Sequence, residues 1–240
     1  MMQKNSNNFI YGRNPLKEAI IAGRVKQVYL SNSFSHQEIL QLLKDSHVKT
    51  QVVNNAELDR MCSGGVHQGI AGEIKDYEYY SFDSVIQKAN KQEKPLIVML
   101  DGINDTHNLG AILRSCDVFD VAGIIIGKHN QVPLNATVAK ASAGAINYVP
   151  VCLVNNLNQA ISRLKEEGYW IVSTDGSGTS NYQDIKYDFK VVLVIGSEGM
   201  GVSKLVLKNS DYIVKIPQYG HVNSLNASVA AGILLSEIRR

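Results

Sequence analysis

The chain has 240 residues, of which 45% are hydrophobic and 19% are charged, and its formal net charge at pH 7 is +2. Three cysteines, odd in number and without metal-ligand spacing, exclude a disulfide framework and give no metal site. The first residues contain no apolar signal core, and the apolar run at 229–235 is far shorter than the roughly 20 residues of a membrane span. We therefore expect a soluble cytoplasmic protein with one large or two modest domains, without a metal or a membrane as partner.

The positive charge is concentrated in the front part of the chain. Residues 1–75 contain nine Lys and Arg against six Asp and Glu, whereas residues 76–240 contain fifteen and sixteen. A mildly basic front part is compatible with a polyanionic partner, because Lys and Arg contact phosphates. Scattered solvated charge explains the same numbers equally well.

Residues 9–74 predict a small α/β unit. Pro15 suits the first turn of a helix, and apolar residues follow it at helical spacing. Strand-like runs at 25–30, 48–53 and 70–74 alternate with helical stretches at 38–44 and 57–61. Residues 76–80 are polar and aromatic, and residues 84–93 are a helical stretch rich in Lys and Gln that Pro95 ends. We expect a linker over 76–95.

From residue 96 onward, strands and helices alternate. Strands are expected at 96–101, 122–127, 148–153, 169–174, 190–195 and 212–216, and helices at 109–119, 135–144, 156–167, 202–209 and 224–238. This order predicts an α/β domain with a largely parallel sheet covered on both faces. Ligand pockets in such folds form at the carboxyl ends of the strands.

The first strand end leads into the segment N-L-G-A-I-L-R-S at 108–115. Asn108 is expected to cap the following helix. Arg114 lies off the apolar stripe of that helix and suits a phosphate or carboxylate clamp. From this segment alone, a surface arginine paired with Asp117 or Asp120 is the simpler interpretation.

Two later strand ends are followed by loops of glycine and small polar residues. Asp175 follows the strand at 169–174, where a lone aspartate is a weak signal for ribose binding. The loop G-S-E-G-M-G at 196–201 has Glu198 where the dinucleotide fingerprint has its second glycine, and no P-loop motif is present. These mismatches disfavour a Rossmann-type NAD enzyme and a P-loop NTPase, and leave a simple turn as the alternative to a ligand loop.

The last segment is expected to begin its helix at Ser224 or Asn223. Small residues at 227, 230, 231 and 232 suit either packing on the sheet or a dimer interface. His67, His107 and His221 have no partner pattern and are interpreted as loop histidines. Motifs of hydrolases and metal sites are not found in the sequence.

Together these segments resemble the SpoU/TrmH branch of the SPOUT RNA methyltransferases. The resemblance is carried in order by Asn108 with Arg114, by the loop at 196–201, and by I-P at 216–217 followed by S-L-N-A-S-V-A at 224–230. It covers residues 96–240 strongly. The front part, with I-Y-G-R-N-P-L at 10–16, is similar to the family's RNA-binding domain of ribosomal-protein L30e/L7Ae type. The chain looks most like the RlmB-type members, which 2′-O-methylate a guanosine of 23S rRNA.

The resemblance implies an RNA-substrate-binding domain at 1–75, a linker at 76–95 and a SPOUT domain at 96–240, whose parallel sheet contains a deep trefoil knot. It also implies a homodimer, which the small-residue last helix fits. S-adenosylmethionine would bind in a bent shape within the knot loops. The implied cofactor-binding residues are Thr174, Gly176, Gly196, Ser197, Gly201, Ile216, Ser224 and Leu225.

The resemblance also implies a catalytic group of Arg114, Asn108, Glu198 and Asn226. A ribose 2′-hydroxyl is a poor nucleophile, so methyl transfer needs that oxygen in line and its proton lost or its charge stabilised. Because arginine stays protonated, we expect Arg114 to hold the substrate phosphate and stabilise the developing 2′-oxyanion. Asn108 and Asn226 would orient Arg114 or the ribose, and Glu198 would support its loop or pair with Arg114.

The expected function is S-adenosylmethionine-dependent 2′-O-methylation of a ribose in 23S rRNA, with residues 1–75 supplying most of the RNA affinity. A tRNA ribose methyltransferase of the same superfamily is the nearest alternative, although the tRNA enzymes often carry only short extensions instead of a front domain. A non-catalytic RNA-binding protein is a further alternative, which the four retained polar residues disfavour.

Overall fold

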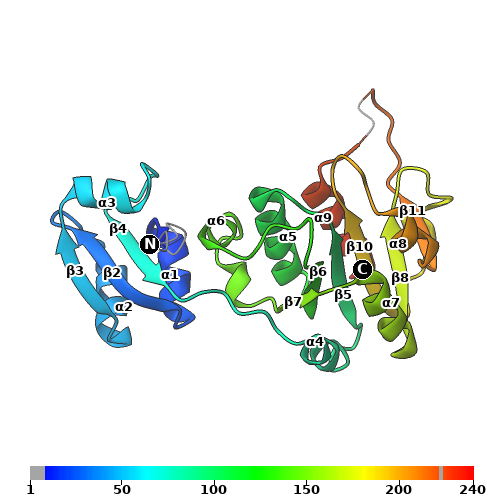
Figure 1. Ribbon diagram of the computed structural model, residues 1–240, viewed down its shortest axis with the longest axis horizontal. Helices are drawn as coiled ribbons and strands as arrows, with labels where there is room; N and C mark the ends of the chain where they lie inside the picture. Colours follow the sequence, from blue (N-terminus) through cyan, green and yellow to red (C-terminus); the bar gives the residue numbers. More distant parts are fainter. Residues whose placement is uncertain (1–8, 222–223) are drawn as a thin grey trace. The chain divides into compact units, whose positions relative to one another are not determined.

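The computed structural model describes residues 9–221 and 224–240, and the chain divides into two compact units (Figure 1). Unit 1 comprises Met1–Glu78 and Leu134–Asn147, and unit 2 comprises Tyr79–Pro133 and Tyr148–Arg240. Asn223, one of the two expected helix caps, lies outside the described residues. Within the described ranges, no helix has the length and apolar character needed to cross a membrane.

Unit 1 is built on a four-stranded sheet in the order β1-β4-β2-β3. β1 (Phe9–Tyr11) and β2 (Val25–Ser31) pair antiparallel with β4 (Ile70–Ile74), and β3 (Lys49–Val53) runs parallel to β2. The helices of this unit are α1 (Arg13–Ile21), α2 (Gln37–Ser46), α3 (Asn55–Met61) and α6 (Ala136–Ala141), with the short 3-10 helix η1 (Ala145–Asn147).

Helix α1 packs closely on β4 because of a glycine. A Cβ atom on Gly72 would lie 2.5 Å from the Cδ1 atom of Leu16, so the buried side chain of Leu16 would have to move to accept a larger residue at this position. His67 lies in a loop, as expected, whereas His107 lies in a helix that begins at Thr106 and is not a loop histidine. The ring of His67 has two partners. Its Nε2 lies 3.1 Å from Oδ1 of Asp59, and its Nδ1 accepts the backbone N–H of Gly69 at 3.0 Å.

Unit 2 contains a seven-stranded sheet in the order β7-β6-β5-β10-β8-β11-β9, in which every neighbouring pair is parallel. The predicted parallel α/β sheet is therefore confirmed. β10 lies between β5 and β8, so its loops are brought between strands far apart in sequence. The trefoil knot stays a prediction. The strands are β5 (Leu96–Asp101), β6 (Gly123–Gly127), β7 (Val151–Val154), β8 (Tyr169–Thr174), β9 (Ser180–Asn181), β10 (Lys190–Gly196) and β11 (Tyr212–Lys215).

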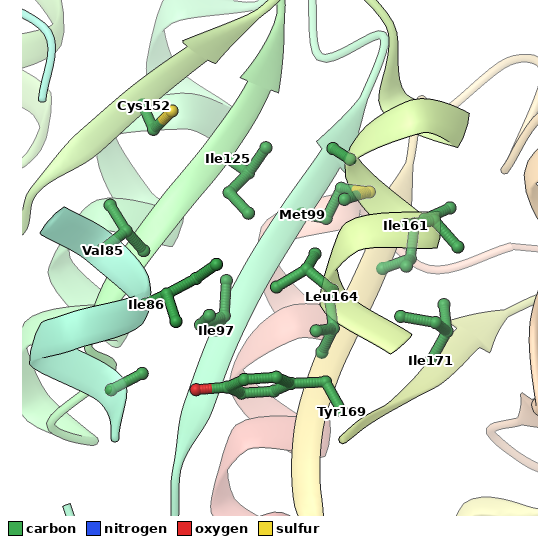
Figure 2. Packing of buried hydrophobic residues seen from close by; sticks show 14 of the residues in the cluster. Val85, Ile86, Ile97, Met99, Ile125, Cys152, Ile161, Leu164, Tyr169 and Ile171 are labelled. Atoms are coloured by element: carbon green, nitrogen blue, oxygen red, sulfur yellow. The ribbon is translucent and has the colours of Figure 1, made fainter. Parts of the chain in front are cut away.

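Helices α4 (Phe82–Ala89) and α7 (Leu157–Glu166) cover one face of this sheet (Figure 2). Ile86 of α4 and Leu164 of α7 pack with Ile97 and Met99 of β5 in a buried cluster. The expectation of a linker over 76–95 is thus wrong for its helical part, because an apolar face of α4 belongs to the core. The other helices of unit 2 are α5 (Thr106–Val118), α8 (Lys204–Lys208), α9 (Ala227–Ile238) and the 3-10 helix η2 (Tyr182–Asp184).

Two expected helix caps are wrong. α5 begins one turn earlier than expected, and Asp105 caps it by accepting the backbone N–H groups of His107 and Asn108. α9 begins after Asn226, whose Oδ1 accepts the backbone N–H groups of its first turn, so Ser224 is not the cap. The side chain of Asn108 therefore does not cap α5, whereas that of Asn226 caps α9.

Candidate functional site

Three loops meet at the carboxyl edge of the sheet in unit 2. β10, β8 and β11 are adjacent and parallel, so the loops that follow them leave the sheet at the same edge. They enclose a pocket, called here the cofactor-side pocket, whose lining includes the apolar side chains of Ile195, Val214 and Ala230. All eight residues expected to bind a cofactor line it: Thr174, Gly176, Gly196, Ser197, Gly201, Ile216, Ser224 and Leu225.

The loop at 196–201 folds back on itself tightly. Ser197 and Gly201 exchange two backbone hydrogen bonds, at 3.2 and 2.9 Å. A Cβ atom on Gly196 would lie 2.1 Å from the carbonyl carbon of Gly201, so position 196 has no room for any side chain. Gly201 itself has a φ of 66°, in the region that favours glycine. The glycines of this motif are therefore required by the shape of the loop.

Asp175 was only a weak signal in the sequence, and the structure gives it a definite place. Its backbone N–H donates to the carbonyl of Val214 at 3.0 Å, which ties the loop after β8 to β11. Its Oδ1 accepts the backbone N–H of Ser177 at 2.8 Å, and its carboxylate lines the cofactor-side pocket. Asp175 thus belongs with the residues expected at this pocket.

Three polar side chains from distant segments form a hydrogen-bonded group, called here the polar trio. Asn108 of α5 donates from Nδ2 to Oε1 of Glu198 at 3.0 Å. Asn226 donates from Nδ2 to Oδ1 of Asn108 at 2.8 Å and also to Oε1 of Glu198. Glu198 lines the cofactor-side pocket, so the trio stands on its wall. Three of the four residues expected to be catalytic are therefore brought together.

Arg114, the fourth expected catalytic residue, forms no hydrogen bond with the trio and does not line the cofactor-side pocket. Its side chain is exposed on α5, and within the described residues it has no hydrogen bond or ion pair. Neither the expected pairing with Glu198 nor the simpler pairing with Asp117 or Asp120 is formed. Its guanidinium is consequently free to meet an anion from outside the chain.

A second hollow adjoins the cofactor-side pocket. Ser197 and Glu198 line both, and Asn108 lines the second, so the polar trio stands between the two. The remaining lining residues of the second hollow are Gly102, Ile103, Asn104, Asp105, Gly199 and Met200.

Across the described part of the chain, no group of three or more His, Cys, Asp or Glu side chains is arranged to hold a metal ion.

Two family models match the chain. The model described as the SpoU rRNA Methylase family matches residues 95–236, and the model described as RNA 2′-O ribose methyltransferase substrate binding matches residues 9–80. A protein of Staphylococcus haemolyticus, named as a TrmH family tRNA/rRNA methyltransferase, is 44% identical over 236 residues. The match covers 96% of this chain and 94% of that protein.

Solved structures share the fold of both units. The SpoU methyltransferase AviRb from Streptomyces viridochromogenes, in complex with AdoMet, has a TM-score of 0.80 at 21% identity, over 99% of this chain and 93% of that one. An AdoMet-bound rRNA methyltransferase from Sinorhizobium meliloti has a TM-score of 0.82 at 23% identity, over 98% and 88%. At these identities, the likeness establishes the fold.

Proposed function

Because the chain belongs to the SpoU rRNA Methylase family and is an RNA methyltransferase of that family, we propose that it methylates a ribose 2′-hydroxyl, that of a guanosine in 23S rRNA. The observation that carries this proposal is the polar trio on the wall of the cofactor-side pocket. It puts oriented polar groups beside a pocket lined by every residue expected to bind S-adenosylmethionine.

The lining of the cofactor-side pocket fits S-adenosylmethionine. Apolar side chains such as Ile195, Ile216 and Leu225 suit the face of an adenine ring, and the tight glycine loop leaves backbone groups near the ligand. The carboxylate of Asp175 suits the ribose hydroxyls as an acceptor. Two solved structures with this fold, from Streptomyces viridochromogenes and Sinorhizobium meliloti, contain bound AdoMet. When bound, the cofactor supplies a methyl group on a positively charged sulfur.

The residues of this chain would then act on the RNA. Asn108 and Asn226 are held in fixed orientations by their shared bonds to Glu198, so they suit alignment of the ribose. Arg114 would bind the substrate phosphate and stabilise charge that develops on the 2′-oxygen, since its guanidinium has no partner within the described residues. Glu198 would position the two amides.

Labelled S-adenosylmethionine and unmodified transcripts test this function. We expect the label in 2′-O-methylguanosine of 23S rRNA, identified after nuclease digestion. Arg114→Ala and Arg114→Lys should each lower kcat about 100-fold, the usual loss of one transition-state donor, while cofactor affinity is kept. Near-normal kcat in either variant would remove Arg114 from the mechanism. Label on a base, or no label, would refute ribose methylation.

A tRNA ribose is the second candidate substrate. The relative from Staphylococcus haemolyticus carries both tRNA and rRNA in its name. The same assay with tRNA transcripts separates the two, because transfer to tRNA alone would replace the rRNA proposal. Complete absence of transfer, with RNA binding retained, would favour the non-catalytic alternative.

We further propose that residues 1–75 supply most of the RNA affinity, that the active form is a homodimer in the cytoplasm, and that the chain of unit 2 is knotted. The match of residues 9–80 to a substrate-binding model and the excess of Lys and Arg, nine against six Asp and Glu, in residues 1–75 support the first point. Arg13 begins α1 with an exposed side chain. Arg13→Ala should weaken RNA binding and lower its salt slope by about 1, and an unchanged slope would count against this role.

A further inference from the structure

The second hollow has a place and a composition that the proposed function does not explain by itself. We infer that it receives the nucleobase of the nucleotide to be methylated and recognises the N–H donors on that base. This inference rests on the proposed function. It adds a subsite and the residues that recognise the base.

The position of the second hollow suits the acceptor nucleotide. It shares the wall formed by Ser197 and Glu198 with the cofactor-side pocket, and Asn108 of the polar trio lines it. Methyl transfer requires the reacting atoms to approach within about 3–3.5 Å in line. The ribose must therefore lie next to the shared wall, and its base, attached to the same sugar, needs a hollow directly beside it.

The charges of the second hollow exclude a phosphate. Its lining contains two carboxylates, Asp105 and Glu198, and no Lys or Arg. An anion placed there would be repelled, whereas ionised carboxylates accept hydrogen bonds from N–H groups. The Oδ1 atom of Asp105 is engaged by the backbone N–H groups of His107 and Asn108, which leaves its Oδ2 for a ligand.

Asn104 adds an amide to this acceptor surface. Its side chain is exposed at the second hollow and forms no hydrogen bond within the described residues. A free amide beside a carboxylate can read the Watson–Crick edge of an unstacked base. Guanine fits this pair of groups best, because it presents a ring N–H next to an exocyclic amino group, whereas uracil has no amino group.

The remaining lining suits the faces of a ring. Gly102 and Gly199 have no side chains, so a planar base can lie against their backbone. Met200 is 91% exposed, and its thioether can cover the other face. An exposed apolar side chain at the rim of a polar hollow has a physical reason if a base packs beneath it.

Gly199 allows the second hollow to be filled without touching the cofactor-side pocket. It lines only the second hollow, and a Cβ atom on it would meet no atom within 4 Å. Gly199→Leu should keep cofactor affinity and lower kcat/KM for 23S transcript about 100-fold, the cost of displacing a reacting group by about 1 Å. Gly176→Leu is the matched control, because Gly176 lines only the cofactor-side pocket and also has open space. It should weaken S-adenosylmethionine binding directly.

Base recognition is tested after the methylated nucleotide has been mapped. A short RNA around that site is made with guanosine or with inosine, which lacks the amino group. The wild type should prefer guanosine at least about tenfold, and Asn104→Ala should lose most of that preference.

Two results would overturn the inference while leaving the proposed function intact: wild-type kcat/KM in Gly199→Leu, and an unchanged preference for guanosine in Asn104→Ala. A mapped uridine would overturn both the base recognition inferred here and the guanosine of the proposed function. If the wild type transfers no methyl group to any RNA, the proposed function fails first, and the base subsite is rejected with it.

Discussion

Asn226 has two roles that different substitutions can separate. Its Oδ1 accepts the backbone N–H groups of Ser228 and Val229 at 2.9 and 3.3 Å, which caps α9. Its Nδ2 donates to Asn108 and Glu198 in the polar trio. Asn226→Ala removes both roles. Asn226→Ser keeps a hydroxyl able to cap the helix but removes the donor that joins the trio.

The structure sets the size of each loss. Removing the cap costs about 1 kcal/mol. The trio contacts contribute about 0.5–1 kcal/mol, less than a buried bond to a charged group would, because Glu198 and Asn226 are exposed. We therefore expect Asn226→Ala to lose about 1.5–2 kcal/mol and Asn226→Ser about 0.5–1 kcal/mol. At roughly 2–4 °C per kcal/mol for a chain of this size, the Tm falls by about 3–8 °C and 1–4 °C.

Activity should follow the trio and not the cap. In both variants Asn108 and Glu198 lose their shared donor, so we expect kcat/KM for RNA to fall about 100-fold. Cofactor affinity should change little. Thermal melting, calorimetric titration with S-adenosylmethionine and initial rates of methyl transfer measure the three quantities separately.

Asn156 provides the matched control. It caps α7 by accepting the N–H groups of Asn158 and Gln159 at 2.8 and 3.2 Å. Asn156→Ala should therefore lose about 1 kcal/mol with unchanged activity. If Asn226→Ser keeps wild-type kcat/KM, the trio orients nothing that matters for catalysis. If it loses as much stability as Asn226→Ala, the hydroxyl does not cap and the assignment of the two roles is wrong.

Three further predictions concern the glycine loop at 196–201, the contacts of a partly buried arginine, and a buried thiol. Gly196→Ala should raise the Kd for S-adenosylmethionine at least about tenfold, because its Cβ would lie 2.1 Å from a backbone carbon. Gly199→Ala, whose Cβ would lie in open space, should leave that Kd unchanged. Equal Kd values in the two variants would refute this. Arg239 donates to the carbonyls of Phe119 and Lys94 at 2.7 Å each and to that of Asp120. Arg239→Met should therefore lower the free energy of unfolding, measured by urea titration, by about 2 kcal/mol. An unchanged midpoint would contradict this role. Burial raises the pKa of Cys152 to about 11, so at pH 8 only about one thiol in 1,000 is ionised. The thiol should therefore react slowly with a thiol reagent in the folded chain, and faster as the pH rises. Rapid reaction at pH 8 would show that the thiol is accessible.

The local sequence pattern was sufficient to predict most strands and helices of unit 2. Strand β8 has the predicted bounds, and β5 does too, because continuous apolar runs mark strands buried on both faces. The helix α4 was missed as a core element. Its polar residues, rich in Lys and Gln, dominated the composition, although Val85, Ile86 and Ala89 form an apolar face that is buried. Composition averages over a helix, whereas burial depends on one side of it.

The helix caps show where local reasoning fails. Asp105 and Asn108 are both good capping residues in the same segment, and Ser224 and Asn226 likewise. Sequence alone cannot choose between neighbours of nearly equal propensity. In the structure, Asp105 caps α5, and Asn108 is left to bind Glu198. The choice depends on a partner 90 positions away along the chain.

The sequence by itself determined that a parallel α/β domain has glycine-rich loops at its strand ends, and the family resemblance implied which residues would line a pocket there. Periodicity and loop composition act over a few residues, so they can be read along the chain. Only the tertiary structure decided that β10 lies between β5 and β8, and that Asn108, Glu198 and Asn226 meet. Those facts depend on the order of strands in the sheet, because strand order alone brings loops distant in sequence to one edge.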